Sequence, residues 1–121
     1  MANVTAVDYV GISVRDLEAA KRWYAMVLGF DSDYAWGEFG AEFQVGGTTV
    51  ALMQMDKIGS EHTPNATALA LHVEDVAVER ARLEGEGVTF QDQFDSSVCH
   101  QAVFHDPDGN VLVLHHRYAP R

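Results

Sequence analysis

The sequence predicts an α+β fold made of two tandem βαβββ modules, each with one helix packed on the outer face of a concave sheet that surrounds a cleft. Residues 7–16 line up with residues 66–75, and both segments alternate apolar and polar residues before they end in an aspartate. A helical pattern follows each segment, and then a short strand and a hairpin signal. Because one helix covers only one face of a sheet, we expect the other face to line a cavity or to meet a partner sheet.

The 121 residues are predicted to form a single domain, 1–121, which is long enough to bury a sizeable core. Module 1 covers about residues 5–55 and module 2 covers about residues 66–117. Between them lies a linker of about residues 56–65, which contains glycine and proline.

The first module begins with a strand and a helix. Val10, Ile12 and Val14 alternate along the strand and share its buried face. Asp16 is placed to cap a helix over about residues 17–28, and Gly29 is placed to end it. The apolar stripe of this helix consists of Leu17, Ala20, Tyr24, Val27 and Leu28.

Gly46-Gly47 is a two-residue turn signal that joins strands at about 41–45 and 48–53. Across this turn Val45 pairs with Thr48, so alternate residues of both strands share a face. The core face is predicted to hold Phe43, Val50 and Leu52, and the cavity face to hold Glu42, Gln44, Thr49, Ala51 and Met53.

The second module repeats the plan. Asp75 is the expected cap of a helix over about residues 76–84, which ends at Gly85 or Gly87. The hairpin turn Asp106-Pro107-Asp108-Gly109-Asn110 then joins strands at about 98–104 and 111–115.

The register of this second hairpin is open. If Phe104 pairs with Val111, Ala102 opposes Val113 and His100 opposes His115, whereas a one-residue bulge moves the set to the other face.

Composition excludes several classes of function. The net charge of −10 and only eight basic residues argue against nucleic-acid binding, although acidity can steer a cationic ligand or serve solubility alone. No apolar run is long enough to span a membrane, and because the first residues lack the pattern of a signal peptide, we expect none. A single cysteine, Cys99, is expected to be a buried, inert thiol and fits a reducing compartment, so we expect a cytoplasmic protein.

Strand alternation gives the expected ligand-binding residues without an alignment. They are aromatic, polar and methionine side chains on the faces that the helices leave uncovered, a composition typical of small-molecule sites. The predicted set is Tyr9, Ser13, Trp36, Glu42, Gln44, Met53, His72, His100 and His115.

Each of these residues has a plainer reading. The aromatic side chains near Trp36 can stack a planar ligand or pack across a dimer interface. Met53 can be ordinary core, and His72 can be a partly exposed histidine.

Two motifs resemble those of the vicinal oxygen chelate superfamily, which includes glyoxalases, extradiol dioxygenases and bleomycin-resistance proteins. The first runs from Tyr9 to Asp16 and on to Trp23-Tyr24…Leu28-Gly29-Phe30, and the second is Phe104–Leu114. The resemblance covers essentially the whole chain and implies homodimers. It also implies metal ligands at four positions, which are occupied here by Tyr9, Ala51, Ala68 and Val113. Three of these side chains cannot bind a metal, so no metal is expected there.

We therefore expect a metal-free binding protein that sequesters an aromatic or cationic small molecule, as antibiotic-resistance members of the family do. The alternative is a lyase, isomerase or dioxygenase-like enzyme. It would use a displaced divalent transition metal held by Glu42, His72, His100 and His115, or His72 as a general base without metal. A third possibility is a protein whose open sheets serve association alone. No nucleophile elbow or phosphate-binding loop is present in the sequence.

Overall fold

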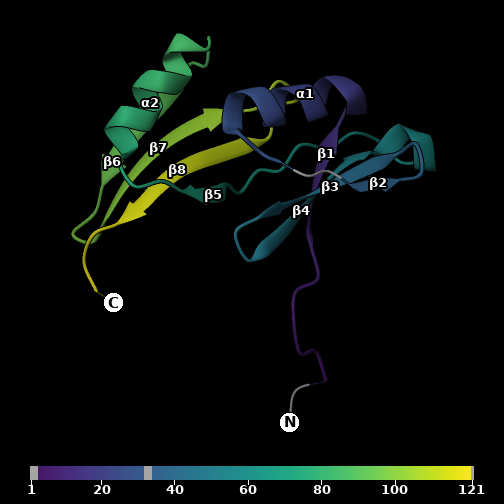
Figure 1. Cartoon of the computed structure of the whole chain (residues 1–121), viewed down its shortest axis with the longest axis horizontal. Coiled ribbons are helices and arrows are strands. Elements are labelled where there is room, and N and C mark those ends of the chain that lie inside the picture. The colour runs from purple at the N-terminus through teal and green to yellow at the C-terminus, as the bar shows by residue number, and fades with distance from the viewer. Residues whose placement is uncertain (1–2, 32–33, 121) are drawn as a thin grey trace. The chain divides into compact units, whose positions relative to one another are not determined.

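The computed structural model describes residues 3–31 and 34–120, with only the backbone described at 92–94. The chain divides into two compact units, Met1–Thr63 (unit 1) and Pro64–Arg121 (unit 2). Each unit has the order strand, helix and three strands, so the prediction of an α+β fold with two βαβββ modules is confirmed (Figure 1).

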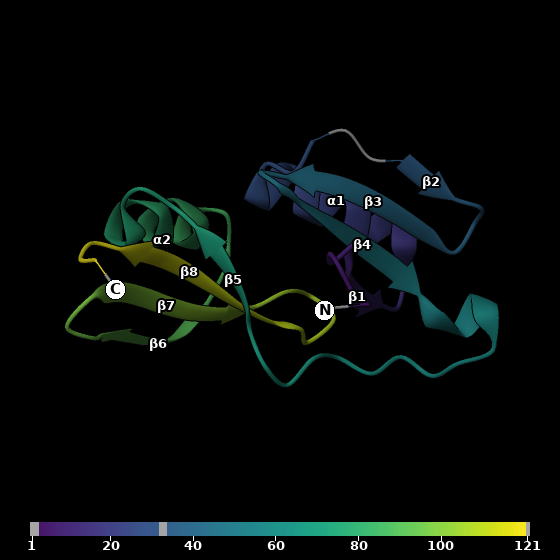
Figure 2. The ribbon, with the colours of Figure 1, turned by 90° about the horizontal axis from the view of Figure 1, so that it is seen from below.

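The sheet of unit 1 has the order β1-β4-β3-β2 (Figure 2). The parallel pair β1 and β4 is completed by antiparallel pairing of β4 with β3 and of β3 with β2. A short 3₁₀ helix, η1 (Met55–Ile58), follows β4. The elements are β1 (Val10–Val14), α1 (Leu17–Leu28), β2 (Tyr34–Trp36), β3 (Gly40–Val45) and β4 (Thr48–Gln54).

The sheet of unit 2 repeats this arrangement in the order β5-β8-β7-β6. Here β5 is parallel to β8, and the other two pairs are antiparallel. Its elements are β5 (Leu69–His72), α2 (Val76–Gly85), β6 (Phe90–Asp95), β7 (Cys99–His105) and β8 (Val111–Arg117).

Both helices begin at the predicted aspartates. The carboxylate of Asp16 accepts a hydrogen bond from the amide of Ala19 at 3.1 Å, and that of Asp75 accepts one from Val78 at 3.1 Å. Each bond satisfies an amide that has no partner within the helix. Gly29 ends α1 in the left-handed conformation, with φ of 75°, as predicted.

The core of unit 1 lies between α1 and one face of its sheet. Tyr24 is fully buried, its ring lies 5.4 Å from that of Phe30, and Phe30 lies 5.8 Å from Phe43 of β3. These ring contacts connect the helix to the sheet. The predicted register across the Gly46-Gly47 turn is confirmed, since Val45 pairs with Thr48.

In the second hairpin, formed by β7 and β8, Phe104 does not pair with Val111. Phe104 pairs with Leu112, Ala102 with Leu114 and His100 with His116. The physical reason is burial, because this register places Ala102 and Phe104 opposite two large aliphatic side chains, all at most 2% exposed. Of the two arrangements that the sequence left open, the pairing of His100 with His115 is therefore not the one observed, and these two histidines lie on opposite faces.

Hydrogen bonds inside the turn hold the chain in a conformation that agrees with this register. The carboxylate of Asp106 accepts bonds from the amides of Asp108 and Asn110 and, at 2.8 Å, from the side-chain amide of Asn110. Gly109 supplies the left-handed residue, with φ of 87°. Asn110 also accepts a bond from the amide of Asn65, whose side chain accepts one from Val111. The turn is thus fastened to the segment that precedes β5.

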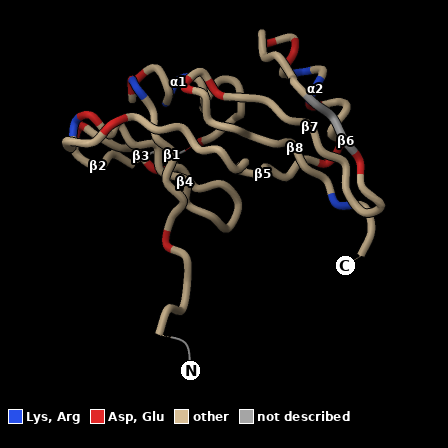
Figure 3. Tube along the Cα trace, turned by 180° about the vertical axis from the view of Figure 1, so that it is seen from behind, with Lys and Arg blue, Asp and Glu red and all other residues tan. Residues whose placement is uncertain are grey.

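Charged residues are spread over helices, strand ends and loops of both units (Figure 3). Within the described residues, no helix has both the length and the apolar character that a membrane crossing requires. Cys99 is buried with a free thiol, as predicted.

We predict that Asn110→Ala destabilises the protein by about 2–4 kcal/mol, because it removes the hydrogen bonds that the Asn110 side chain makes with the buried Asp106 carboxylate and with the Asn65 amide. Urea unfolding followed by circular dichroism measures this loss. Asn3→Ala removes an exposed asparagine and is the matched control, expected to change little. Equal stability of the two variants would contradict the structural role of the turn.

Candidate functional site

The sheet of unit 1 has one face that α1 does not cover, and three rows of side chains cross it. The register places Gly11, Ala51, Glu42 and Tyr34 in one row and Ser13, Met53, Gly40 and Trp36 in the next. Thr49 and Gln44 begin a third row. The face predicted from alternation in β3 and β4 is therefore the observed one.

Two aromatic rings from opposite sheet edges meet on this face. Tyr9 directly precedes β1 and Trp36 ends β2, yet their ring centroids lie 4.9 Å apart at an interplanar angle of 85°. Small residues in the central strands allow this contact, since Ala51 and Gly40 lie between the two edges. Tyr9 remains 45% exposed, so the pair offers aromatic surface to solvent.

Gly40 is required for the position of the indole. A Cβ at this residue would lie 3.3 Å from both the Trp36 Cβ and the backbone oxygen of Leu52. At Gly11 an added Cβ would lie 3.3 Å from the sulfur of Met53, so that side chain covers the glycine. The absence of side chains at these two positions thus lets Trp36 and Met53 approach the strand backbone closely.

Polar groups surround the aromatic pair. Glu42 is half-buried, and within the described part of the chain its carboxylate has no hydrogen-bond or ion-pair partner. The hydroxyl of Thr49 donates to Gln44 at 2.9 Å. Ser13 Oγ lies 2.8 Å from Nδ1 of His62 and accepts a bond from the amide of Thr63. Sequence patterns missed His62, because a linker residue has no strand register to place it.

The four positions at which the family places metal ligands are equivalent in the two units. Gly11, two residues after Tyr9, pairs with Ala51, and Ala70, two residues after Ala68, pairs with Val113. Three of the four side chains are hydrocarbon, and one phenol does not hold an ion. These residues therefore do not fit a metal.

The histidines of unit 2 do not form one group. His115 pairs with His72 and Gln101 on the sheet face that α2 does not cover. His100 and His116 share the other sheet face, the one that α2 covers. There Nδ1 of His100 lies 2.7 Å from Oδ1 of Asp95, and the His100 ring stacks on that of Tyr118 with the ring centroids 4.5 Å apart. Of the residues of the predicted displaced site, His100 thus lies on the opposite sheet face from His72 and His115, and Glu42 belongs to unit 1.

Two pockets lie beside the N-terminal end of α2. The larger has a volume of about 420 Å³ and contains His100, the smaller has about 360 Å³ and contains His72, and Glu74 and Asp75 line both. Glu74, His116 and Tyr118 are residues of these pockets that the sequence analysis missed. His116 follows His115, the partner of His72, and its Nδ1 bonds to the backbone oxygen of Val73; this position depends on the pairing of β8 with β5, which the sequence analysis did not derive.

Comparison with known families and structures agrees with this architecture. The model of the Glyoxalase/Bleomycin resistance protein/Dioxygenase superfamily matches residues 6–114. A glyoxalase/bleomycin resistance protein/dioxygenase from Nocardioides superposes with a TM-score of 0.79 at 17% identity, covering 100% of this chain and 89% of that one. None of the curated proteins compared with the chain matches it.

Two further similar structures are of proteins with different functions, one an enzyme and one a binding protein. Lactoylglutathione lyase from Agrobacterium tumefaciens has a TM-score of 0.77 at 16% identity and covers 93% of each chain. TnmS3, an antibiotic binding protein from Streptomyces sp. CB03234, has a TM-score of 0.75 at 28% identity, covering 94% of this chain and 97% of that one. The same fold therefore accompanies an enzyme and a binding protein.

We predict that Gly40→Ala displaces the Trp36 indole and lowers stability by about 1–3 kcal/mol, because the new methyl group meets a backbone oxygen that cannot move aside. Near-ultraviolet circular dichroism and urea unfolding report the two effects. Gly47→Ala is the control, since no atom lies within 4 Å of the Cβ it adds. An unchanged aromatic spectrum in Gly40→Ala would contradict this role.

Proposed function

Because the chain belongs to the Glyoxalase/Bleomycin resistance protein/Dioxygenase superfamily, we propose that it binds and sequesters a planar aromatic compound carrying a positive charge. The observation that carries this proposal is the uncovered sheet face of unit 1. There the exposed Tyr9 ring contacts the half-buried Trp36, and on the same surface lies Glu42, a half-buried carboxylate with no partner among the described residues. The similarity to an antibiotic binding protein supports the same class of function.

The chemistry of this face suits a planar cation. Each well-placed aromatic contact contributes about 0.5–1.5 kcal/mol, and a cation over an indole or phenol ring about 0.5–2 kcal/mol. The side chain of Glu42 shares a row with Tyr34, so a charge on the ligand can approach a carboxylate while its ring system stacks. Gln44, Thr49 and Ser13 add hydrogen-bonding groups at the margin.

The residues at the family's metal positions support binding over Lewis-acid catalysis. Lewis-acid catalysis needs a metal that several protein ligands hold in place. Ala51, Ala68 and Val113 have hydrocarbon side chains, which cannot bind a metal. Affinity must then come from stacking, hydrogen bonds and charge. Retention of the scaffold with loss of the ligand set is the pattern we expect of a sequestering protein.

We predict that proflavine, a planar cation, quenches the fluorescence of Trp36 on binding. The chain has two tryptophans, so the titration uses a Trp23→Phe background in which Trp36 alone reports. Tyr9→Ala weakens binding about tenfold through lost ring contact, and Glu42→Gln weakens it by a similar factor through lost charge attraction.

A charge series separates the two effects. Anthraquinone, a neutral planar compound, should bind Glu42→Gln and the parent protein equally, whereas Tyr9→Ala should weaken both ligands. Met26→Ala, an exposed change on α1, is the control that leaves both affinities unchanged. Absence of binding by any planar compound up to its solubility limit, with a doubled molecular mass in light scattering, would instead assign this face to homodimerisation.

A further inference from the structure

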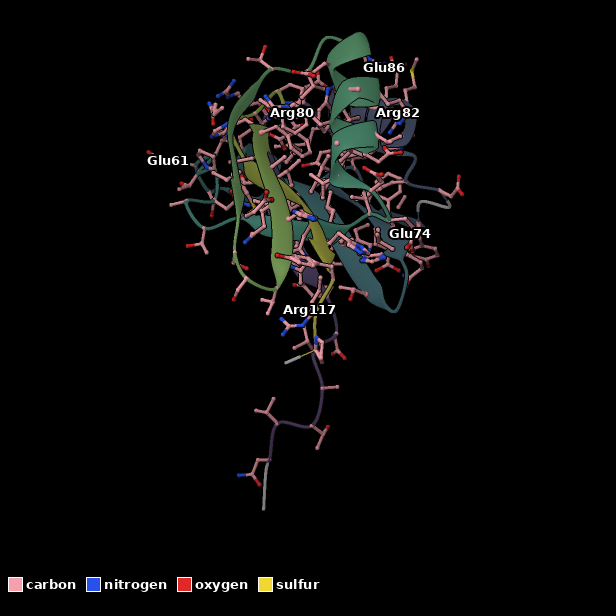
Figure 4. The ribbon with its side chains drawn as sticks, turned by 90° about the vertical axis from the view of Figure 1, so that its left-hand side faces the viewer. Glu61, Glu74, Arg80, Arg82, Glu86 and Arg117 are labelled. Atoms are coloured by element: carbon pink, nitrogen blue, oxygen red, sulfur yellow. The ribbon has the colours of Figure 1, made fainter. Side chains whose placement is uncertain are left out.

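Three side chains with metal-binding atoms meet where β5 ends in unit 2. His72, Glu74 and His116 each offer one ligand atom, and these atoms all lie within 4.8 Å of one another. Figure 4 shows Glu74 just beyond the N-terminal end of α2. We propose that this cluster binds one divalent transition-metal ion, with Zn²⁺ the best match to its ligands.

The hydrogen bond of His116 fixes the tautomer that a metal ligand needs. Its Nδ1 lies 3.0 Å from the backbone oxygen of Val73. A carbonyl oxygen only accepts, so Nδ1 carries the proton and Nε2 keeps its lone pair. Histidines that bind metals regularly donate their other ring N–H to a backbone carbonyl in this way, which fixes both tautomer and ring direction.

His72 and Glu74 supply the other two ligands. His72 Nε2 lies 3.1 Å from Glu74 Oε1, and the side chains are 65% and 89% exposed. An ion pair so exposed adds little to stability, and both side chains can turn toward an ion without a packing cost. Two imidazoles and one carboxylate are a ligand set suited to Zn²⁺, which leaves at least one position for water or another ligand.

The surroundings favour a cation with an open coordination position. Glu74 and Asp75 line both pockets at this end of α2, Glu79 lines the smaller one and Asp95 the larger. These carboxylates lower the potential around the cluster and concentrate cations there. The pockets provide room for the remaining metal ligands.

The first module shows that the fold alone does not require these donors. The internal repeat places Ser13 and Arg15 at the positions of His72 and Glu74, and Gln54, the partner of Val14, at the position of His116. There Gln54 accepts a hydrogen bond from the amide of Leu17 and so caps α1. The equivalent backbone thus carries a helix cap in unit 1 and a group of metal donors in unit 2.

The test is a titration of the tag-free full chain with Zn²⁺ alone, after removal of bound metal with a chelator, followed by calorimetry. We expect one Zn²⁺ per chain. His72→Ala and His116→Ala should each weaken binding at least as much as the loss of a group that hydrogen-bonds to a metal ligand, about 10–100-fold, and Glu74→Gln should weaken it about tenfold. His105→Ala removes a histidine outside the cluster and should leave affinity unchanged.

Position is tested separately with Co²⁺, whose paramagnetism should broaden the amide resonances of residues 72–75 and 115–117 first. No saturable Zn²⁺ binding, equal binding by His72→Ala and the parent chain, or an equal loss in His105→Ala would overturn the proposal. If His116→Ala does not fold, the two exposed residues decide the outcome. The site is independent of the aromatic face of unit 1, so failure of either proposal leaves the other intact.

Discussion

The constraint on which the structure depends is that one helix covers only one face of a four-stranded sheet. In each unit the covered face holds the aliphatic and aromatic core, including Tyr24, Phe43 and Phe104. The sequence must then place on the other face side chains that tolerate water or contact a ligand. In unit 1 these are aromatic rings, glycines and a carboxylate that has no partner in the part of the chain that the structure describes, and this combination is the basis of the proposed binding function.

The two modules show how one backbone pattern carries different chemistry. Both helices start at an aspartate cap, and both parallel strand pairs have the same register. The side chains at equivalent positions nevertheless differ, as Gln54 and His116 do. Function therefore resides in a few side chains placed by a repeated scaffold.

Much of this could be predicted from sequence. Helix caps, the Gly46-Gly47 turn and the uncovered face of β3 and β4 follow from local rules, because each depends on neighbouring residues. The register of the second hairpin could not be predicted. Its strands are joined by a five-residue loop held by the Asp106 side chain, and the alternation of apolar and polar residues does not decide which residues pair across such a loop.

That register separated His100 from His115, while the parallel pairing of β5 with β8 brought His116 beside His72. The Tyr9–Trp36 contact was also beyond sequence rules, because it joins opposite sheet edges across Gly40 and Ala51. Contacts between distant strands depend on the packing of whole side chains, which strand periodicity does not describe.

The most direct test of the central claim is the two-dimensional amide and indole NMR spectrum during titration with a planar cation. The account predicts that the indole N–H of Trp36 and the amides of β1, β3 and β4 shift together, while the indole N–H of Trp23 on α1 stays in place. Shifts confined to the helices, or equal shifts of both indoles, would contradict it.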